Sequence, residues 1–483
     1  MENIFKGLEP EAVFRNFEAL TRIPRSSGNE KQVSDFLVKF AKDHGLEVIQ
    51  DDTLNVIIKK NATPGYEQSK TVILQGHMDM VAVKDDDLEF DFDKDPIPVV
   101  VDGDMIRTKG TTLGADNGIA VAMTMAVLES KTLEHPEIIA LFTVSEETGM
   151  DGVINLNPDH VKGDILINLD SEEEGIFWTS CAGGVNSTVT LPVEWEECPA
   201  DQCSYEVVIA GLLGGHSGAE IDKNRASAVN LMGRLLYGLD KQFEIQISNV
   251  QGGTKTNAIP LKAKATVAVD LKCEENLKDA VAQMESMFKN EYKTSDPGLF
   301  VQINKTENSR ILSVQSRRNL VSLLRLLPFG VQTMSSDIKG LVESSNNIGI
   351  VEIKENEVVI SNSIRSSVKS RKEEIAERIE AISNLTHAAA NLSSDYPEWQ
   401  YKADSPLREL MLKTYRDMYN KEAKVEAIHA GLECGFLKEK VGDIDMISLG
   451  PDLFDVHTTK ERMSISSAGR VFEFLCQILK RLK

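Results

Sequence analysis

Three largely apolar runs constrain the fold of this 483-residue chain more than any other feature. Residues 71–74, 138–144 and 164–169 each have the length of a strand, and helical apolar spacing lies between them, as at 118–128. Strands that are apolar on both sides are buried on both faces, which is typical of sheets covered by helices. The order of these elements therefore predicts an α/β fold.

The pattern of elements changes near residue 185 and again after Pro397. The middle segment has a looser α+β order, whereas an α/β pattern with helices at 406–419 and 468–482 resumes afterwards. A chain of this length exceeds one ordinary core, so two domains are expected. We predict a catalytic domain made of residues 1–184 and 398–483, with residues 185–397 inserted into it.

The inserted segment contains a weak internal repeat. Residues 252–259, followed by a strand and a helix at 275–288, are echoed by residues 343–350, a strand that reaches Ser363 and Ile364, and a helix at 373–392. This echo predicts a duplicated unit of roughly 90 residues.

Composition excludes several classes of partner. The formal charge of −22 and the pI of about 4.9 leave no basic surface for nucleic acid or anionic membrane. The first residues lack an apolar signal core, and no run approaches the roughly 18 apolar residues that span a bilayer. Six cysteines without a Cys-x-x-Cys pair are expected to be free thiols in a reducing compartment. We expect a soluble cytoplasmic protein that acts on small molecules or peptides.

Candidate metal ligands follow the predicted strands, at the ends where α/β folds place function. His77 and Asp79 follow the strand at 71–74, and such a pair can bind a metal through the imidazole while the carboxylate orients the ring. Taken alone, the pair is more often a surface His beside a solvated Asp. Asp116 lies between glycines just before a helix, where it is either an N-cap or a carboxylate that bridges two cations.

The remaining candidates occupy equivalent places. Glu146 and Glu147 follow another strand, and because neighbouring strand residues face opposite ways, one could bind metal while the other handles a proton. Solvated glutamates are the alternative. Asp170 ends a further strand, and His457 supplies a second imidazole. Two His and three carboxylates form a mixed nitrogen and oxygen donor set that suits zinc, manganese or cobalt.

These motifs, in this order, resemble the co-catalytic zinc peptidases, a family that includes carboxypeptidase G, peptidase T, aminoacylases and carnosinase-like dipeptidases. The resemblance covers essentially the whole chain. Within the family, the length, the large insertion and residues 429–435 resemble the bacterial aminoacylhistidine (Xaa-His) dipeptidase branch, also called peptidase D. The resemblance implies a mixed-sheet catalytic domain, an inserted α+β lid domain that the repeat suggests is duplicated, and two divalent ions.

The resemblance also implies roles for the strand-end residues. Asp79 would orient His77, Glu146 would be the general base for a water activated between the two ions, and the peptide bond after Asp116 would be cis. Within the family, an Asp at position 170 is typical of the members that are dipeptidases and aminopeptidases. The implied ligands are His77 and Asp170 for one ion, Glu147 and His457 for the other, and Asp116 between them.

Three further residues are implied for the lid. His216, within residues 214–218, resembles the family segment whose His polarises the scissile carbonyl, although a plain loop is the alternative. Asn257 resembles a substrate contact, and Arg365 could pair with a substrate carboxylate. In dimeric relatives, the His that corresponds to His216 can come from the partner subunit. A duplicated lid could instead cover the site of its own chain. A homodimer is therefore possible, and His216 could act either in its own chain or in the partner chain.

The sequence thus predicts hydrolysis of unblocked dipeptides, such as aminoacyl-histidine. A related tripeptidase or N-acyl amino acid deacylase would keep the same ligands. A non-catalytic binding homologue is the alternative from another class, but it would not need a base at Glu146.

Overall fold

The computed structural model describes residues 4–483, which divide into two compact units. The first unit contains the chain up to Ser180, Tyr401–Ala427 and Leu432–Lys483, and the second contains Cys181–Gln400 and Ile428–Gly431. These boundaries lie within a few residues of the predicted ones, apart from Ile428–Gly431, which the sequence assigned to the catalytic domain. This segment belongs to the second unit, where Ala182 N donates to its carbonyls.

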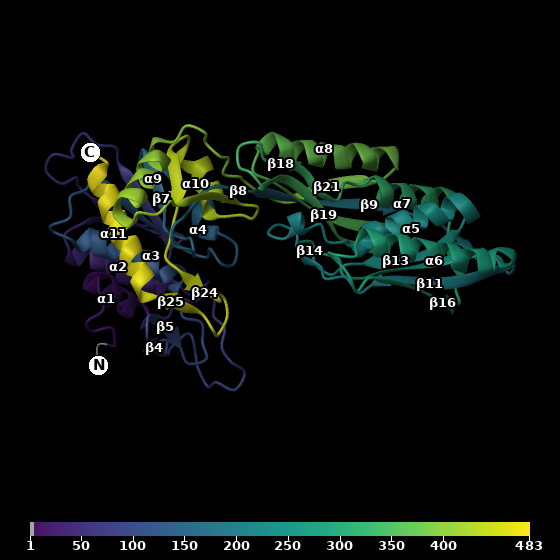
Figure 1. The fold of residues 1–483 in the computed structure, drawn as a ribbon, viewed down its shortest axis with the longest axis horizontal. Helices are drawn as coiled ribbons and strands as arrows, with labels where there is room; N and C mark the ends of the chain where they lie inside the picture. The colour runs from purple at the N-terminus through teal and green to yellow at the C-terminus, as the bar shows by residue number, and fades with distance from the viewer. Residues whose placement is uncertain (1–3) are drawn as a thin grey trace. The chain divides into compact units, whose positions relative to one another are not determined.

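The first unit is built around an eight-stranded sheet with the order β1-β2-β6-β3-β7-β23-β8-β22 (Figure 1). Its strands, with those of a small sheet ordered β24-β25-β5-β4, are β1 (Glu47–Gln50), β2 (Val56–Lys60), β3 (Val72–His77), β4 (Val99–Asp102), β5 (Met105–Thr108), β6 (Ile138–Thr143), β7 (Ile165–Asn168), β8 (Ile176–Cys181), β22 (Lys424–Ile428), β23 (Asp445–Ser448), β24 (Leu453–Phe454) and β25 (Arg462–Ser464). Its α-helices are α1 (Glu11–Leu20), α2 (Lys31–Asp43), α3 (Ala115–Glu129), α4 (Asp151–Asn155), α9 (Pro406–Tyr419), α10 (Glu433–Val441) and α11 (Ile465–Arg481).

The predicted mixed sheet with helices on both faces is confirmed. Strands β3, β6 and β7 are buried at every position and run parallel, whereas β1 and β2 are antiparallel. Successive residues of a strand point to opposite faces of the sheet, so the surroundings of Gln75 and Gly76 show what covers each face. A Cβ at Gly76 would lie 2.4 Å from Asn117 Oδ1 of α3, while Gln75 contacts Glu433 of α10 on the other face.

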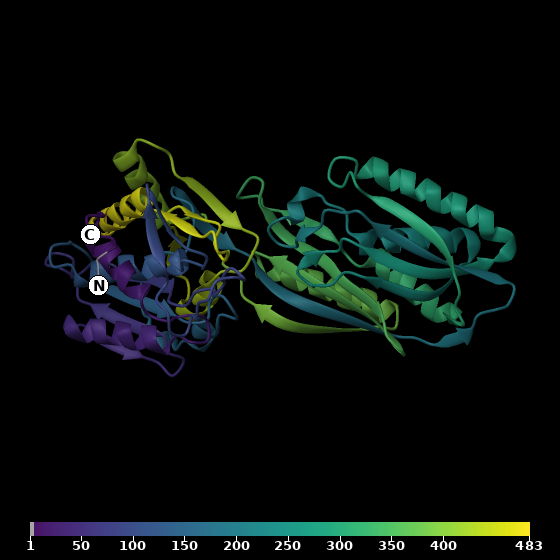
Figure 2. The ribbon, with the colours of Figure 1, turned by 90° about the horizontal axis from the view of Figure 1, so that it is seen from below.

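The second unit contains one large sheet, which Figure 2 shows in teal and green. Its strand order is β16-β11-β15-β13-β19-β20-β9-β21, and β18 pairs with β19. The strands of the whole unit are β9 (Gly183–Pro192), β10 (Trp195–Glu197), β11 (Gln202–Ala210), β12 (Gly215–His216), β13 (Gln246–Gly252), β14 (Ala258–Ile259), β15 (Ala263–Asp270), β16 (Phe300–Thr306), β17 (Arg310–Leu312), β18 (Gly330–Met334), β19 (Val342–Ile353), β20 (Glu357–Ser366) and β21 (Ala389–Tyr396). Its α-helices are α5 (Ala228–Phe243), α6 (Glu274–Glu291), α7 (Val314–Leu326) and α8 (Lys369–Leu385).

This unit consists of two copies of one topology. Elements β11-α5-β13-β15-α6-β16 form a βαββαβ arrangement, and β9-α7-β19-β20-α8-β21 form the same arrangement, with the first copy inserted between β9 and α7. The second strands of the two copies, β13 and β19, meet antiparallel at Gln251↔Glu352 and Gly252↔Val351. The two copies thereby join into one continuous sheet, as the repeat in the sequence indicates.

One side of this sheet is covered. Alternate residues of β15, such as Ala265 and Val267, belong to a core shared with all four helices, whereas Lys264 and Thr266 are partly exposed. The period of two along the strand matches a sheet with one covered face.

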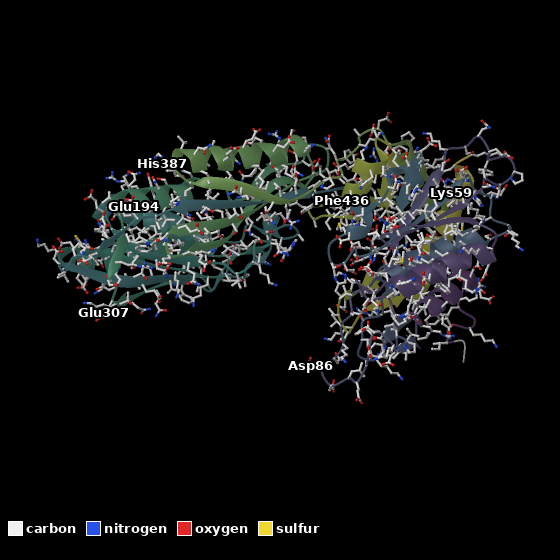
Figure 3. All side chains as sticks on the ribbon, turned by 180° about the vertical axis from the view of Figure 1, so that it is seen from behind. Lys59, Asp86, Glu194, Glu307, His387 and Phe436 are labelled. Atoms are coloured by element: carbon white, nitrogen blue, oxygen red, sulfur yellow. The ribbon has the colours of Figure 1, made fainter. Side chains whose placement is uncertain are left out.

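The predicted helix at 373–392 is wrong at its C-terminal end. Helix α8 stops at Leu385, His387 adopts a left-handed φ of 58°, and residues from Ala389 onward form β21 (Figure 3 labels His387). The alanines at 388–390 favour a helix locally. Pairing with β9 in the register Ala389↔Thr190 overrides that preference.

Two further findings concern the described residues as a group. None of their helices has the length and apolar character needed to cross a membrane. Cys198, Cys203, Cys273 and Cys476 are free thiols, as predicted.

Candidate metal centre

The end of β3 carries the first imidazole. His77 is almost fully buried, and its Nδ1 lies 3.2 Å from Asp79 Oδ1. Asp79 also accepts hydrogen bonds from Ser27 Oγ (2.8 Å) and from the backbone N–H groups of Glu146 (3.2 Å) and Glu147 (3.3 Å). Burial works against ionisation of Asp79, but the hydrogen bond and charge of His77, with smaller contributions from Ser27 and the Glu146 N–H, outweigh it and lower the pKa of the carboxyl group. Asp79 therefore fixes the ring of His77 and the Glu146–Glu147 backbone together.

Asp116 lies between the two imidazoles. Its Oδ1 is 3.2 Å from His77 Nε2, and its Oδ2 is 3.1 Å from His457 Nε2. The residue has non-helical backbone angles inside the first turn of α3, and its peptide bond to Asn117 is cis. Since each oxygen faces a different ring, this carboxylate has the placement that a ligand bridging two cations requires.

His457 completes the second half of the site. Its Nε2 lies 3.0 Å from both carboxylate oxygens of Glu147, and its side chain is about half exposed at 48%. Hydrogen bonds to Asp116 and Glu147 raise the pKa of His457 to about 10. Its ring nitrogen thus lies in a strongly negative electrostatic environment.

Asp170 and Glu146 are the remaining acids. Asp170 Oδ1 lies 3.4 Å from His77 Nε2, and burial raises the pKa of Asp170 to about 6 although His77 works against that shift. Burial also raises the pKa of Glu146, to which the neighbouring negative charges of Asp170, Glu433 and Glu147 contribute. Crowded buried carboxylates of this kind favour a bound cation.

The donor atoms fit divalent metal ions. Imidazole nitrogens and carboxylate oxygens converge in three groups, with all atoms of a group within 4.8 Å of one another. Two of these groups share Asp116, and nitrogen and oxygen donors in this combination suit zinc, manganese or cobalt. The groups are His77–Asp116–Asp170, His77–Glu146–Glu147 and Asp116–Glu147–His457. The structure thus brings all the predicted ligands together, with Glu146 beside them; their roles stay predictions.

Sequence reasoning missed two charged residues that hold the site. The carboxylate of Glu461 accepts hydrogen bonds from four successive backbone N–H groups at 113–116, at 2.7, 3.0, 2.8 and 3.4 Å. Arg25, which is 2% exposed, donates to the carbonyls of Met78 and Asp79, both at 3.1 Å, and to that of Gly114. Both residues fix the backbone next to predicted ligands. Sequence reasoning missed them because the groups that they bind lie far away in the sequence.

The residues predicted for the lid come together in the second unit. His216 pairs with Ala258 across the β12–β14 ribbon, and Ser217 N donates to the Asn257 carbonyl at 2.9 Å. A Cβ at Gly218 would lie 3.0 Å from His216 Cε1 and 3.3 Å from Arg365 Nε. His216, Asn257 and Arg365, which we call the lid cluster, therefore surround one short loop.

Two polar contacts beside the lid cluster were not predicted. His429 Nε2 lies 2.7 Å from Ser345 Oγ, and Arg365 Nη1 donates to Tyr396 Oη at 2.8 Å. Burial, with Arg365 and His216 adding to it, lowers the pKa of His429 to about 3, so this ring is neutral. The sequence places His429 in a stretch that resembles the family, which was the one available signal.

Comparisons with known proteins agree with this geometry. Residues 209–296 match the peptidase dimerisation domain of M20 peptidases. The chain is 37% identical to the cytosol non-specific dipeptidase of Escherichia coli over 476 residues, which cover 98% of each protein. The structure is similar to that of aminoacylhistidine dipeptidase from Vibrio alginolyticus, with a TM-score of 0.96 and 34% identity over 100% of this chain and 98% of the other.

A more distant structure shares the fold alone. Aminopeptidase PepT from Bacillus cereus has a TM-score of 0.58 at 15% identity, over 98% of this chain and 99% of the other. Sequence identity of 37% along nearly the full length of both proteins, with the match to the dimerisation domain, shows that the chain belongs to the M20 family of peptidases.

Proposed function

We propose that this chain is a metal-dependent dipeptidase that holds two divalent ions and hydrolyses unblocked dipeptides. One observation carries the proposal: the two oxygens of Asp116 face two different imidazoles, each with a further carboxylate beside it. The relatives support the substrate class, since the Escherichia coli protein and the Vibrio alginolyticus protein are both named dipeptidases. They differ in the named preference, so we propose no particular side chain for the substrate.

The residues divide between two ions. His77 and Asp170 would hold one, Glu147 and His457 the other, and Asp116 both. When bound, two such ions, which we propose to be zinc with manganese or cobalt as alternatives, lower the pKa of a shared water and polarise the scissile carbonyl.

Glu146 would act as the general base. Its carboxylate lies beside the ligands, and its backbone N–H is held by Asp79 at 3.2 Å. It takes a proton from the attacking water while the water oxygen bonds to the carbonyl carbon. It then gives the proton to the amide nitrogen, whose bond to carbon breaks and releases the amine.

His216 has the protonation state that an oxyanion donor needs. Its Nδ1 accepts hydrogen bonds from the N–H groups of Gly218 (3.3 Å) and Ala219 (3.1 Å), which leaves the ring proton on Nε2. Burial and the nearby Arg365 lower the pKa of His216 and keep the ring neutral. We propose that this Nε2–H stabilises the charge that develops on the carbonyl oxygen.

His216→Ala is therefore expected to lower kcat by about 10²-fold, with a smaller rise in KM and unchanged metal content. The matched control is His387→Ala, which removes an exposed imidazole from the same unit and should behave like the wild type. Normal kcat in His216→Ala would return His216 to a plain loop residue.

Whether His216 acts within its own chain is testable by mixing. The match to the dimerisation domain supports a homodimer, while the two copies within one unit favour a lid that serves its own chain. Mixing the inactive variants His216→Ala and Glu146→Gln should restore no activity if His216 acts in its own chain. Recovery toward a quarter of wild-type activity, the most that randomly formed hybrid dimers can restore, would mean that the partner supplies it.

Arg365 is the proposed partner of the substrate carboxylate, and Asn257 a further substrate contact. Arg365 is 8% exposed, and its Nε has no hydrogen-bond partner among the residues that the structure describes. A buried guanidinium left without an anion is costly. Amidation of the dipeptide carboxyl group should therefore lower kcat/KM by about 10- to 100-fold in the wild type and by much less in Arg365→Met.

A substrate panel tests the proposed function. We would measure kcat/KM for β-Ala-His, an alanyl dipeptide, its amide, the matching tripeptide and an N-acetyl amino acid. The proposal predicts turnover of the free dipeptides and at least about 10-fold lower values for the others. Equal turnover of the tripeptide would make the chain a tripeptidase, and preference for the N-acetyl amino acid would make it a deacylase.

We also propose a cytoplasmic location, because the Escherichia coli relative is named a cytosol dipeptidase. The acidic composition gives no reason to expect a nucleic acid or membrane partner.

A further inference from the structure

A buried carboxylate that the proposed mechanism does not use lies beneath the ligands. Glu433 is the first residue of α10, the helix that also carries Phe436 (labelled in Figure 3), and its side chain is almost fully buried. Its Oε2 accepts hydrogen bonds from Gln75 Nε2 (2.6 Å) and Thr143 Oγ1 (2.8 Å). Burial raises the pKa of Glu433 to about 7, against the effect of nearby His77. A buried carboxyl group of this kind is costly to keep, so its contacts matter.

The hydrogen bonds continue from Glu433 to a predicted ligand. Gln75 Oε1 accepts from Asn168 Nδ2 at 2.5 Å, and Asn168 Oδ1 accepts from the backbone N–H of Asp170 at 3.3 Å. Each amide has one donating and one accepting end. Because Glu433 Oε2 accepts from Gln75 Nε2, the NH₂ end of the Gln75 amide faces Glu433, and the direction of every later bond follows.

These bonds connect the three strands that deliver ligands. Strands β6, β3 and β7 are adjacent in the sheet, and the polar chain crosses all of them. Each member lies shortly before a predicted ligand or base on its own strand: Gln75 precedes His77, Thr143 precedes Glu146 and Glu147, and Asn168 precedes Asp170.

We propose that Glu433 is a positioning residue for the metal centre, which orients the Gln75–Asn168 amide chain and thereby holds the ends of β3, β6 and β7. Residues that orient metal ligands typically change metal affinity 10- to 100-fold when they are replaced. The inference rests on the proposed function only in taking His77, Asp170 and Glu147 as ligands. Ion binding can be measured without substrate, so its result is separate from that of the substrate panel.

The test compares zinc affinity in three variants. Glu433→Met keeps the length of the side chain but removes the acceptor, so Gln75 loses the partner that orients it. We expect at least about 10-fold weaker binding of one ion, measured by competition with a chelator, and an altered visible spectrum of the Co²⁺ form. Glu433→Gln keeps an accepting oxygen and should stay within about 3-fold of the wild type. The control is Leu437→Ala, which removes a buried apolar contact of the same helix and should lower Tm without changing affinity.

A second variant keeps the test decisive if Glu433→Met fails to fold. Asn168→Leu leaves Glu433 and Gln75 in place but breaks the link to Asp170, and it should weaken zinc binding by a similar factor. Wild-type affinity and Co²⁺ spectrum in either Glu433→Met or Asn168→Leu would overturn the proposal. Equal loss of affinity in Leu437→Ala would also overturn it, because the effect would then be one of general stability.

Discussion

Glu146→Gln is expected to lower kcat by at least about 10²-fold while both ions stay bound. The amide keeps the volume of the side chain but cannot take the proton of the attacking water. The backbone N–H of residue 146 would still donate to Asp79, so the loop that carries Glu147 should be retained. Steady-state kinetics with a free dipeptide and metal analysis by mass spectrometry measure the two quantities separately.

Glu147→Gln is the matched control for this prediction. It makes the same chemical change one residue away, in a side chain that contacts His457 at 3.0 Å. We expect this variant to lose metal along with activity. If Glu146→Gln also lost its metal, Glu146 would be a ligand and the proton transfer would need another group.

Asp116→Ala is expected to remove both ions and with them all measurable turnover. Its carboxylate faces both imidazoles, so its loss opens both halves of the site. His457→Ala opens one half only, so this variant should lose one ion and recover part of its activity at high zinc or manganese. Metal content per chain after dialysis distinguishes the two.

Asp443→Ala serves as the control for these variants, because Asp443 is an exposed carboxylate in the same unit. It should bind metal as the wild type does. If Asp116→Ala retained one tightly bound ion, Asp116 would be a ligand of a single ion, and the bridged arrangement would be wrong.

The strand ends made the candidate site visible in the sequence. A continuous apolar strand is a local signal, and the residue that follows it can be identified from that strand alone. His77 could be found in this way because it ends β3, and Glu147 and Asp170 because they lie within a few residues after β6 and β7. Parallel strands then bring such residues to one edge of the sheet.

The residues that support the site could not be found by the same reasoning. Glu461 binds backbone groups more than 340 residues earlier, and Glu433 contacts Gln75 across 358 positions. No periodicity in the sequence connects such pairs, since only the packed fold brings them together. Their carboxylates are indistinguishable in sequence from the many solvated acids of this acidic chain.

The repeat illustrates the same limit on a larger scale. Similar segments at 252–259 and 343–350 indicated two copies, and the topology has them. The sequence did not show that the first copy is inserted between β9 and α7 of the second, because that order depends on pairing between strands far apart. Strand β21 was likewise missed, since its alanines favour a helix until β9 pairs with them.

A metal titration tests the central claim most directly. Protein stripped of metal would be titrated with zinc while bound ions and hydrolysis of a free dipeptide are followed together. We predict two ions per chain, no turnover in the stripped protein, and activity that returns as the sites fill. Full activity without metal, or binding of fewer than about one ion per chain, would contradict the account.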